Sequence, residues 1–218
     1  MKRRLDLVVF DWDGTLLDST AAIVRAILSA CADLGIDPPG EAAARHVIGL
    51  GLEDALAGAM PWLDPRDYPR LAERFRHHYL AQDHLLSLYP GAERLIARLR
   101  GRGYLLGIAT GKTRLGLRRA LVVAGLEGRF AATRCADECR PKPHPAMLLD
   151  LMAQTGVAPA RTLMVGDTTH DVKMAHHARV SALAVSYGAH SREMLAQERP
   201  LDCVDTVEAL AEWFEANG

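Results

Sequence analysis

Residues 5–15, which read LDLVVFDWDGT, decide the fold. The run Leu5–Phe10 is almost entirely apolar and ends at Asp11. Runs with so little polar alternation are typical of strands that are covered on both faces in a parallel sheet. In open α/β sheets, ligands bind beyond the carboxyl ends of the strands. We therefore expect Asp11 and Asp13 to lie at the ligand-binding edge of a parallel sheet.

Three more apolar runs predict strands, and helical patterns lie between or after them. The expected strands are Tyr104–Ala109, Thr162–Val165 and Ser181–Val185. The expected helices are Ala92–Arg100, Leu115–Ala124, Pro145–Thr155 and a last helix that ends at Ala216, with Asp205 and Glu208 as its capping box. This alternation predicts an α/β fold with a Rossmann-like, doubly wound parallel sheet.

One stretch, from about Leu17 to Leu88, shows helical periodicity and no convincing strand. Ile23, Ile27, Cys31 and Leu34 share one helix face that Gly35 closes, and Leu71, Phe75 and Tyr79 indicate a second helix. The α/β pattern resumes near residues 89–91, Tyr-Pro-Gly, a turn signal. We therefore expect an all-helical cap domain over residues 18–87, inserted into a core formed by residues 1–17 and 88–218.

Composition excludes several classes of protein. The chain has 218 residues, of which 49% are hydrophobic and 24% charged, and its formal net charge of -1 argues against a nucleic-acid binder. No apolar run reaches the ~18–20 residues of a membrane span, and the N-terminal apolar run is too short for a signal peptide. A cytoplasmic protein without a membrane partner is expected. The four cysteines do not form a disulfide framework, and Cys135 and Cys139 lack the partners of a structural zinc site.

The polar residues that follow the expected strands make chemical sense together. Asp11, at the end of a buried strand, can be held rigidly as a nucleophile. Asp11 and Asp167 could bind Mg²⁺ together with the carbonyl oxygen of Asp13, and the metal would relieve repulsion between a carboxylate and a phosphate. Lys142 adds a second positive charge. These residues predict a site for phosphate chemistry.

Three smaller roles complete this site. Thr110 offers a hydroxyl group and Gly111 an unobstructed backbone N–H to phosphate oxygens. Asp13 lies two residues after the nucleophile, where it could protonate a leaving alcohol and later deprotonate water. The sequence therefore predicts hydrolysis of a phosphomonoester through a phosphoaspartate.

The ordered motifs resemble those of the haloacid dehalogenase-like (HAD) superfamily. The matching residues are Asp11-Trp12-Asp13-Gly14-Thr15, Ala109-Thr110-Gly111, Lys142, and Gly166-Asp167 with Asp171. The helical insert matches the family's cap, and the chain is most similar to phosphoglycolate phosphatase-like members. The resemblance implies the roles given above, and it implies that Asp171 is a further carboxylate on the metal side, binding directly or through water. It makes 2-phosphoglycolate the first candidate substrate.

Several simpler interpretations stay open. Asp171 could be only the N-cap of a helix over Val172–Ala178. Lys112 could face the substrate or be a solvated lysine, and His46 and Gly49 could contribute to substrate choice or form a turn between helices. His170 is expected to be solvated or hydrogen-bonded rather than a metal ligand.

Three other functions compete with phosphatase activity. A phosphomutase of the β-phosphoglucomutase type would use the same core motifs. A dehalogenase is disfavoured because haloacid dehalogenases lack the second aspartate of the first motif, whereas Asp13 is present. A catalytically silent phospho-ligand-binding protein could share the fold, but it would be expected to have lost a catalytic carboxylate.

Overall fold

The core of the protein is one parallel β-sheet. A computed structural model describes residues 5–217. The described strands, in the order β3-β2-β1-β4-β5-β6, all pair in parallel. Their bounds are β1 Leu7–Phe10, β2 Leu105–Thr110, β3 Ala132–Cys135, β4 Thr162–Gly166, β5 Ser181–Val185 and β6 Asp202–Val204. This order reverses between β1 and β4, which is where doubly wound sheets bind ligands.

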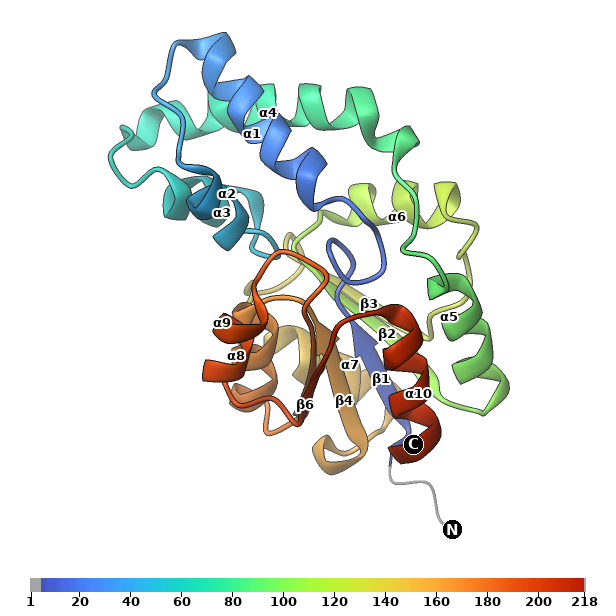
Figure 1. Ribbon diagram of the computed structural model, residues 1–218. Coiled ribbons are helices and arrows are strands. Elements are labelled where there is room, and N and C mark those ends of the chain that lie inside the picture. The colour runs from blue at the N-terminus through green and yellow to red at the C-terminus, as the bar shows by residue number, and fades with distance from the viewer. Residues whose placement is uncertain (1–4, 218) are drawn as a thin grey trace.

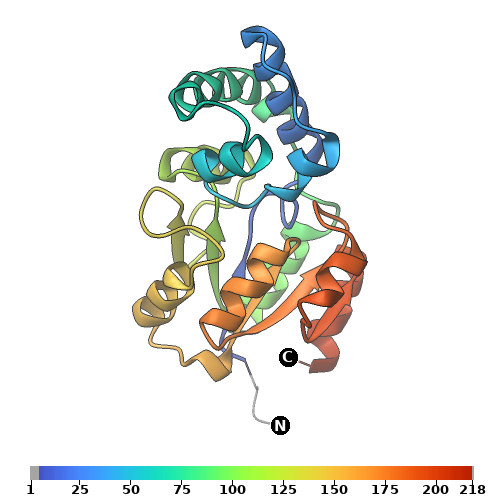
Figure 2. The ribbon, with the colours of Figure 1, turned by 90° about the vertical axis from the view of Figure 1, so that its left-hand side faces the viewer.

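Helices cover both faces of the sheet (Figures 1 and 2). α5 (Ala92–Gly101), α6 (Arg114–Val123) and α10 (Val207–Asn217) pack on one face, and α7 (Ala146–Thr155), α8 (Thr169–His177) and α9 (Arg192–Gln197) pack on the other. Side chains of β1 alternate between the two, so that Val8 and Phe10 join the first apolar cluster and Leu7 and Val9 the second. The prediction of a doubly wound α/β core is confirmed.

The sequence interpretation missed both edge strands of the sheet. β3 contains Thr133 and Arg134, which are only half-buried, and β6 has three residues, of which Asp202 is exposed. Edge strands bury less of their surface, so neither carries the continuous apolar run that marked the central strands.

Two helix starts also differ from the prediction. α10 is capped by Thr206, whose hydroxyl oxygen accepts a hydrogen bond from the Ala209 N–H at 3.0 Å. The expected capping residue, Asp205, instead accepts hydrogen bonds from Ser186 and Arg192. The expected capping box is therefore wrong, because Asp205 is committed to a tertiary contact. Pro145 is the residue before α7, not its first residue.

The helical cap stands over the edge of the sheet at which β1 ends (Figure 1). It contains α1 (Thr20–Leu34), α2 (Glu41–His46), α3 (Leu52–Ala59) and α4 (Tyr68–Gln82), with short 3₁₀ turns at Pro65–Asp67 and Asp83–Leu85 and a separate apolar cluster of its own. The prediction of two long helices is confirmed, including Gly35 with a φ of 64° at the end of α1. α2 and α3 are too short to show a clear period in the sequence.

Two chain segments join the cap to the core side by side. Leu17 and Leu88 form an antiparallel bridge, and the Asp18 N–H donates a hydrogen bond to the Ser87 carbonyl at 3.0 Å.

None of the helices described within residues 5–217 has the length and apolar character that crossing a membrane requires.

Because the cap helices form an apolar cluster of their own, truncating a side chain buried in that cluster should lower the stability of the protein. Leu56 of α3 is fully buried in it, so Leu56→Ala should lower the free energy of unfolding by about 2–5 kcal/mol. The matched control is Leu85→Ala, because Leu85 is 73% exposed and its truncation should cost less than about 0.5 kcal/mol. Urea denaturation measures both. Equal effects of the two substitutions would contradict the assignment of this core.

Candidate active site

A buried lysine joins two buried carboxylates at the switch point of the sheet. Asp11 directly follows β1, and its N–H extends the pairing with β4 by donating to Val165 O at 2.9 Å. Lys142 reaches in from the loop between β3 and α7, with Nζ 2.7 Å from Asp11 Oδ1 and 2.7 Å from Asp171 Oδ1. All three side chains are buried. The structure thus brings together residues that are far apart in sequence.

Asp167 is fixed by donors from two other segments. It follows β4, and its Oδ1 accepts a hydrogen bond from Thr15 Oγ1 at 2.8 Å, while its Oδ2 accepts one from the Ala189 N–H at 2.7 Å. Gly14 and Gly188 make this possible, because a Cβ atom at either position would overlap the Asp167 carboxylate. The side chain therefore has one orientation.

Asp171 combines a helix-capping role with a place in the cluster. Thr168 is the N-cap of α8, and Asp171 is the third helical residue of its capping box. Asp171 Oδ2 accepts from the Thr168 N–H at 3.1 Å and from Thr168 Oγ1 at 2.7 Å, which leaves Oδ1 for Lys142. The alternative that Asp171 is only an N-cap is therefore wrong, and its helix begins at Thr169 rather than at Val172.

The cluster has the composition of a divalent cation site. Single carboxylate oxygens of Asp11, Asp167 and Asp171 all lie within 4.8 Å of one another. Asp11 Oδ2 is buried and has no hydrogen-bond partner among the described residues. Mg²⁺ prefers oxygen ligands from carboxylates, so a set of three acidic groups with an unpartnered oxygen fits this ion.

Burial and mutual repulsion shape the charges of the cluster. Burial raises the pKa of Asp11 well above its usual range, and Asp171 and Asp167 add to the effect, while Lys142 acts against it. Burial, with repulsion from Asp171, raises the pKa of Asp167 to about 7. Burial alone would lower the pKa of Lys142, but Asp11 and Asp171 outweigh it and the net pKa is raised. One lysine is too little positive charge for three buried acids, and a divalent cation would redress the balance.

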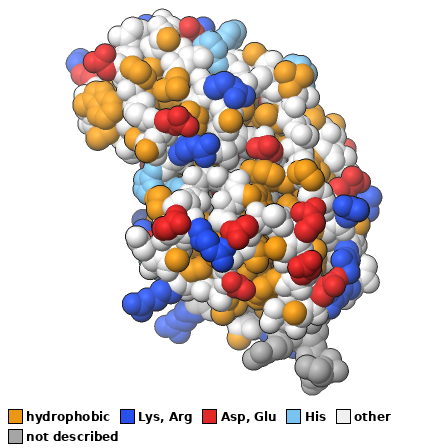
Figure 3. Space-filling view, viewed as in Figure 1, with side chains coloured by type: hydrophobic (Ala, Val, Ile, Leu, Met, Phe, Trp, Pro, Cys, Tyr) orange, Lys and Arg blue, Asp and Glu red, His pale blue; other side chains and the backbone are white. Residues whose placement is uncertain are grey.

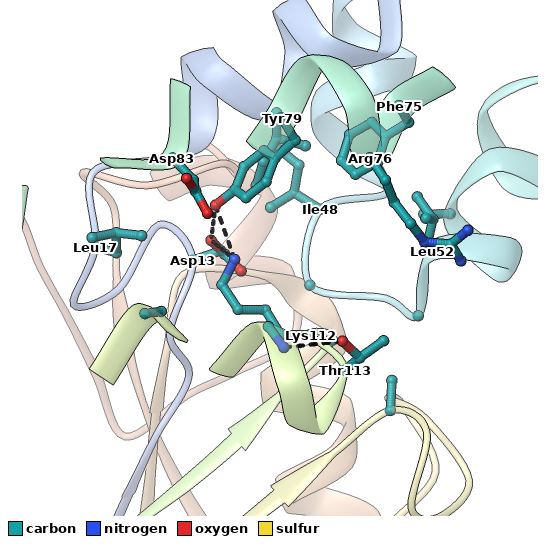
Figure 4. Close-up of a pocket in the computed structure, with 18 of the residues that line it drawn as sticks. Asp13, Leu17, Ile48, Leu52, Phe75, Arg76, Tyr79, Asp83, Lys112 and Thr113 are labelled. Carbon is teal, nitrogen blue, oxygen red and sulfur yellow. Dashed lines mark hydrogen bonds and ion pairs between the residues drawn. The ribbon is translucent and has the colours of Figure 1, made fainter. Parts of the chain in front are cut away.

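The Asp13 carboxylate lies beside Lys112 and Tyr79, on the side of the cap (Figure 4). Its Oδ1 accepts a hydrogen bond from Ser19 Oγ at 2.7 Å and lies 3.2 Å from Lys112 Nζ. Tyr79 of α4 completes this group, because Lys112 Nζ donates to its hydroxyl oxygen at 2.9 Å. In the sequence, Tyr79 is predicted only to lie on a helix face, because nothing in its spacing links it to residue 13. The Lys112 side chain is only 11% exposed and is ion-paired, so the solvated alternative for this residue is wrong.

Glycines let the cap lie directly on the catalytic edge of the core. Thr110, the last residue of β2, is fully buried, and its hydroxyl oxygen accepts the Lys112 N–H at 3.2 Å. A Cβ atom on Gly111 would overlap the carbonyl oxygen of Leu50. Gly49 has a φ of 92°, and a Cβ atom there would lie 3.7 Å from Asp11 Oδ2. The structure therefore places Gly49 and Gly111 at the site.

Two histidines of the core form hydrogen bonds with the end of α2. The His46 carbonyl oxygen accepts hydrogen bonds from His170 Nε2 at 2.8 Å and from His190 Nε2 at 3.0 Å. His190 Nδ1 accepts the Thr169 N–H at 3.0 Å, which leaves the proton on Nε2. The His46 ring stacks on the His190 ring at a centroid distance of 4.9 Å. His46 thus forms a contact between cap and core, and His170 is hydrogen-bonded as expected.

A cavity of about 980 Å³ opens between cap and core above Asp13. Its lining includes Lys112, Gly111 and Gly49, together with apolar side chains from α1 and α4. Figure 3 shows hydrophobic side chains reaching the surface where the two parts meet. Entry of a substrate from this cavity would place it against the Asp13 carboxylate.

The fold and this arrangement of motifs define a class of hydrolase. The family model for haloacid dehalogenase-like hydrolases matches residues 8–185, and the chain belongs to that family. The predictions of the family and of a phosphatase-type enzyme are confirmed.

Individual relatives and structures support the same assignment. The chain is 39% identical to "Probable phosphatase IndB" of Dickeya dadantii (strain 3937), over 92% of this chain and 89% of that protein. It is 36% identical to a phosphoglycolate phosphatase of Rhodospirillum rubrum, over 95% of this chain and 90% of that protein. The crystal structure of a hydrolase from Pseudomonas syringae superimposes with a TM-score of 0.89 at 22% identity, covering 97% of this chain and 98% of that one, which shows the common fold.

The tight packing around Asp167 predicts that replacing Gly188 by a residue with a side chain destabilises the protein. Gly188→Ala would force its Cβ into the Asp167 carboxylate, so it should lower the free energy of unfolding by about 1–3 kcal/mol and displace that carboxylate. Gly101→Ala is the control, because a Cβ there has no atom within 4 Å. Urea denaturation of both variants measures the effect, and a neutral Gly188→Ala would show that Asp167 is not confined as described.

Proposed function

We propose that the protein is a Mg²⁺-dependent phosphatase that hydrolyses a small-molecule phosphomonoester through a phosphoaspartate on Asp11. The observation that carries the proposal is the state of the Asp11 carboxylate. One of its oxygens lies 2.7 Å from Lys142 Nζ, and the other is buried without a hydrogen-bond partner among the described residues. A carboxylate held at one oxygen and free at the other is prepared to attack or to bind a metal.

Asp11, Asp167 and the Asp13 carbonyl oxygen would hold the metal, with Asp171 binding directly or through water. Bound there, Mg²⁺ supplies positive charge that neutralises the phosphate oxygens. Lys142, Thr110 and Gly111 would bind the phosphate, since Lys142 carries a charge and the other two lie at the adjoining end of β2. These groups would stabilise charge that develops during transfer.

Asp13 acts as the general acid and base in this proposal. As Asp11 attacks phosphorus, the bond to the ester oxygen breaks, and Asp13 gives that oxygen a proton so that the alcohol leaves. Asp13 then takes a proton from the water that cleaves the phosphoaspartate. Its carboxylate faces the cavity, where the leaving alcohol would lie, and Ser19 and Lys112 fix its position.

The cap would control access to this chemistry. We propose that it spans residues 18–87 and the core residues 1–17 and 88–218, because the Leu17–Leu88 bridge joins the two connecting segments at that boundary. Movement about residues 16–18 and 89–91 would admit substrate, and closure would exclude bulk water.

Several relatives are named phosphoglycolate phosphatase, so 2-phosphoglycolate is the reference substrate for assays. A cytoplasmic location stays a prediction.

Asp11→Asn tests the nucleophile. Because the amide cannot form a phosphoaspartate, Mg²⁺-dependent release of phosphate from p-nitrophenyl phosphate should fall by about 10⁴-fold or more. Asp37→Asn is the control, since Asp37 is exposed on the cap and should keep full activity. Near wild-type turnover by Asp11→Asn would refute the mechanism. Isomerised sugar phosphate without free phosphate would identify a phosphomutase instead.

The raised pKa of Asp167 predicts how pH and Mg²⁺ act on stability. The folded chain holds a proton on Asp167 up to about pH 7, whereas the unfolded chain loses it near pH 4, so without metal this group makes stability fall as pH rises from about 4 to 7. Mg²⁺ must displace that proton. It should therefore raise Tm more at pH 7.5 than at pH 5.5.

Thermal unfolding with and without MgCl₂ at the two pH values measures this effect. Asp167→Asn should lose the Mg²⁺-dependent rise in Tm, and the Asp37→Asn control should keep it. An equal rise in Tm for Asp167→Asn and the wild type would place the metal elsewhere.

A further inference from the structure

The cap side of the cavity is an apolar wall. It is formed by Ile23 and Ile27 of α1, Val47 and Ile48 after α2, and Phe75 and Tyr79 of α4. The Phe75 and Tyr79 rings are nearly parallel, at an interplanar angle of 16° and a centroid distance of 5.8 Å. In Figure 4 Ile48, Phe75 and Tyr79 lie on the cap side of the cavity, above Asp13. Polar cap residues also line the cavity beside this wall, namely Glu53, Asp54, Arg76, Asp83 and His84, so the wall offers hydrocarbon and aromatic surface to one side of a group bound next to Asp13.

The positive charges around the cavity are not placed to receive a small acid. Lys112, beside Asp13, is ion-paired with it at 3.2 Å and hydrogen-bonded to Tyr79. Arg119 is ion-paired with Asp83 at 3.1 Å. Arg76 extends away from Asp13, toward Leu52 (Figure 4). The carboxylate of a two-carbon substrate lies close to its phosphate, so for Lys112 to neutralise it, Lys112 would have to give up its ion pair with Asp13.

The volume of the cavity also favours a leaving group larger than two carbon atoms. Its volume of about 980 Å³ lies at the upper end of the roughly 300–1,000 Å³ that pockets for drug-sized ligands occupy. A two-carbon leaving group would leave most of the apolar wall in contact with water, and covering that wall is favourable.

We propose that the preferred substrate is a phosphomonoester whose alcohol carries an apolar or aromatic ring, which lies against Phe75, Tyr79 and Ile48 while the ester oxygen faces Asp13. The inference rests on the phosphatase function proposed above and narrows its substrate class. In each turnover water replaces the alcohol on phosphorus, and the alcohol leaves with the proton from Asp13, so no further reactant is required.

A set of matched esters tests the proposal on the full-length enzyme with Mg²⁺. 2-Phenylethyl phosphate, ethyl phosphate and 2-phosphoglycolate are all esters of primary alcohols, so differences among them report mainly on the rest of the leaving group. One methylene group in a hydrophobic pocket changes kcat/KM by about 10- to 200-fold. 2-Phenylethyl phosphate should therefore exceed both other esters in kcat/KM by at least about tenfold.

Variants then locate the ring. Phe75→Ala should lower the ratio of kcat/KM for 2-phenylethyl phosphate to that for ethyl phosphate by about tenfold, and the milder Phe75→Leu should lower it less. Trp62→Ala is the matched control, because Trp62 is an exposed aromatic residue of the cap and is not part of the cavity lining. It should leave the ratio unchanged.

The outcomes separate the two proposals. If 2-phosphoglycolate is turned over as well as or better than 2-phenylethyl phosphate, the enzyme is a phosphatase and the inference about the ring is wrong. An unchanged ratio in both Phe75 variants also overturns it. If none of the esters and no p-nitrophenyl phosphate is hydrolysed, the proposed function itself fails, and the inference fails with it.

Discussion

The structure of the catalytic edge depends on one buried cation, the ammonium group of Lys142. It lies 2.7 Å from an oxygen of Asp11 and 2.7 Å from one of Asp171, where all three side chains are removed from water. Buried acids without such a partner would hold protons and could not act as nucleophile or ligand. Lys142 is also not sufficient, because the pKa of Asp11 stays raised beside it. The site is therefore built for one further positive charge.

Topology explains how short motifs from distant parts of the chain meet at this charge. The strand order, not the strand direction, reverses between β1 and β4, and because these neighbouring strands are parallel, Asp11 and Asp167 follow them at the same edge of the sheet. The capping box of α8 then turns Asp171 inward. Glycines at positions 14 and 188 leave room only for the Asp167 carboxylate. Each position follows from backbone geometry, so the cluster is assembled before any substrate arrives.

The sequence was informative where one local rule governed a residue. Central strands, the long cap helices and the aspartates after the strands could be predicted, because burial on both faces and strand ends leave local patterns. Tyr79 and His190 could not, since each acts through a contact with a residue more than sixty positions away. The prediction for Asp205 was wrong because tertiary contacts with Ser186 and Arg192, 19 and 13 positions away, replaced the expected cap. Local patterns thus predicted where the acidic residues of the core lie but not the contacts between cap and core.

In the proposed mechanism, this division also separates the residues that react from those that select the substrate. Asp11, Lys142, Asp167 and Asp171 all belong to core segments, whereas the apolar wall of the cavity belongs to the cap. The two parts meet closely at Gly49 and Gly111, where backbone packs on backbone and no side chain carries specificity. Changes in the side chains of the wall can therefore alter which alcohol fits without moving the carboxylates. Asp13 is the exception, because its residue belongs to the core but its carboxylate is bound by Lys112 and lies beside Tyr79 of the cap, and in the proposed mechanism it is the group that contacts the leaving alcohol.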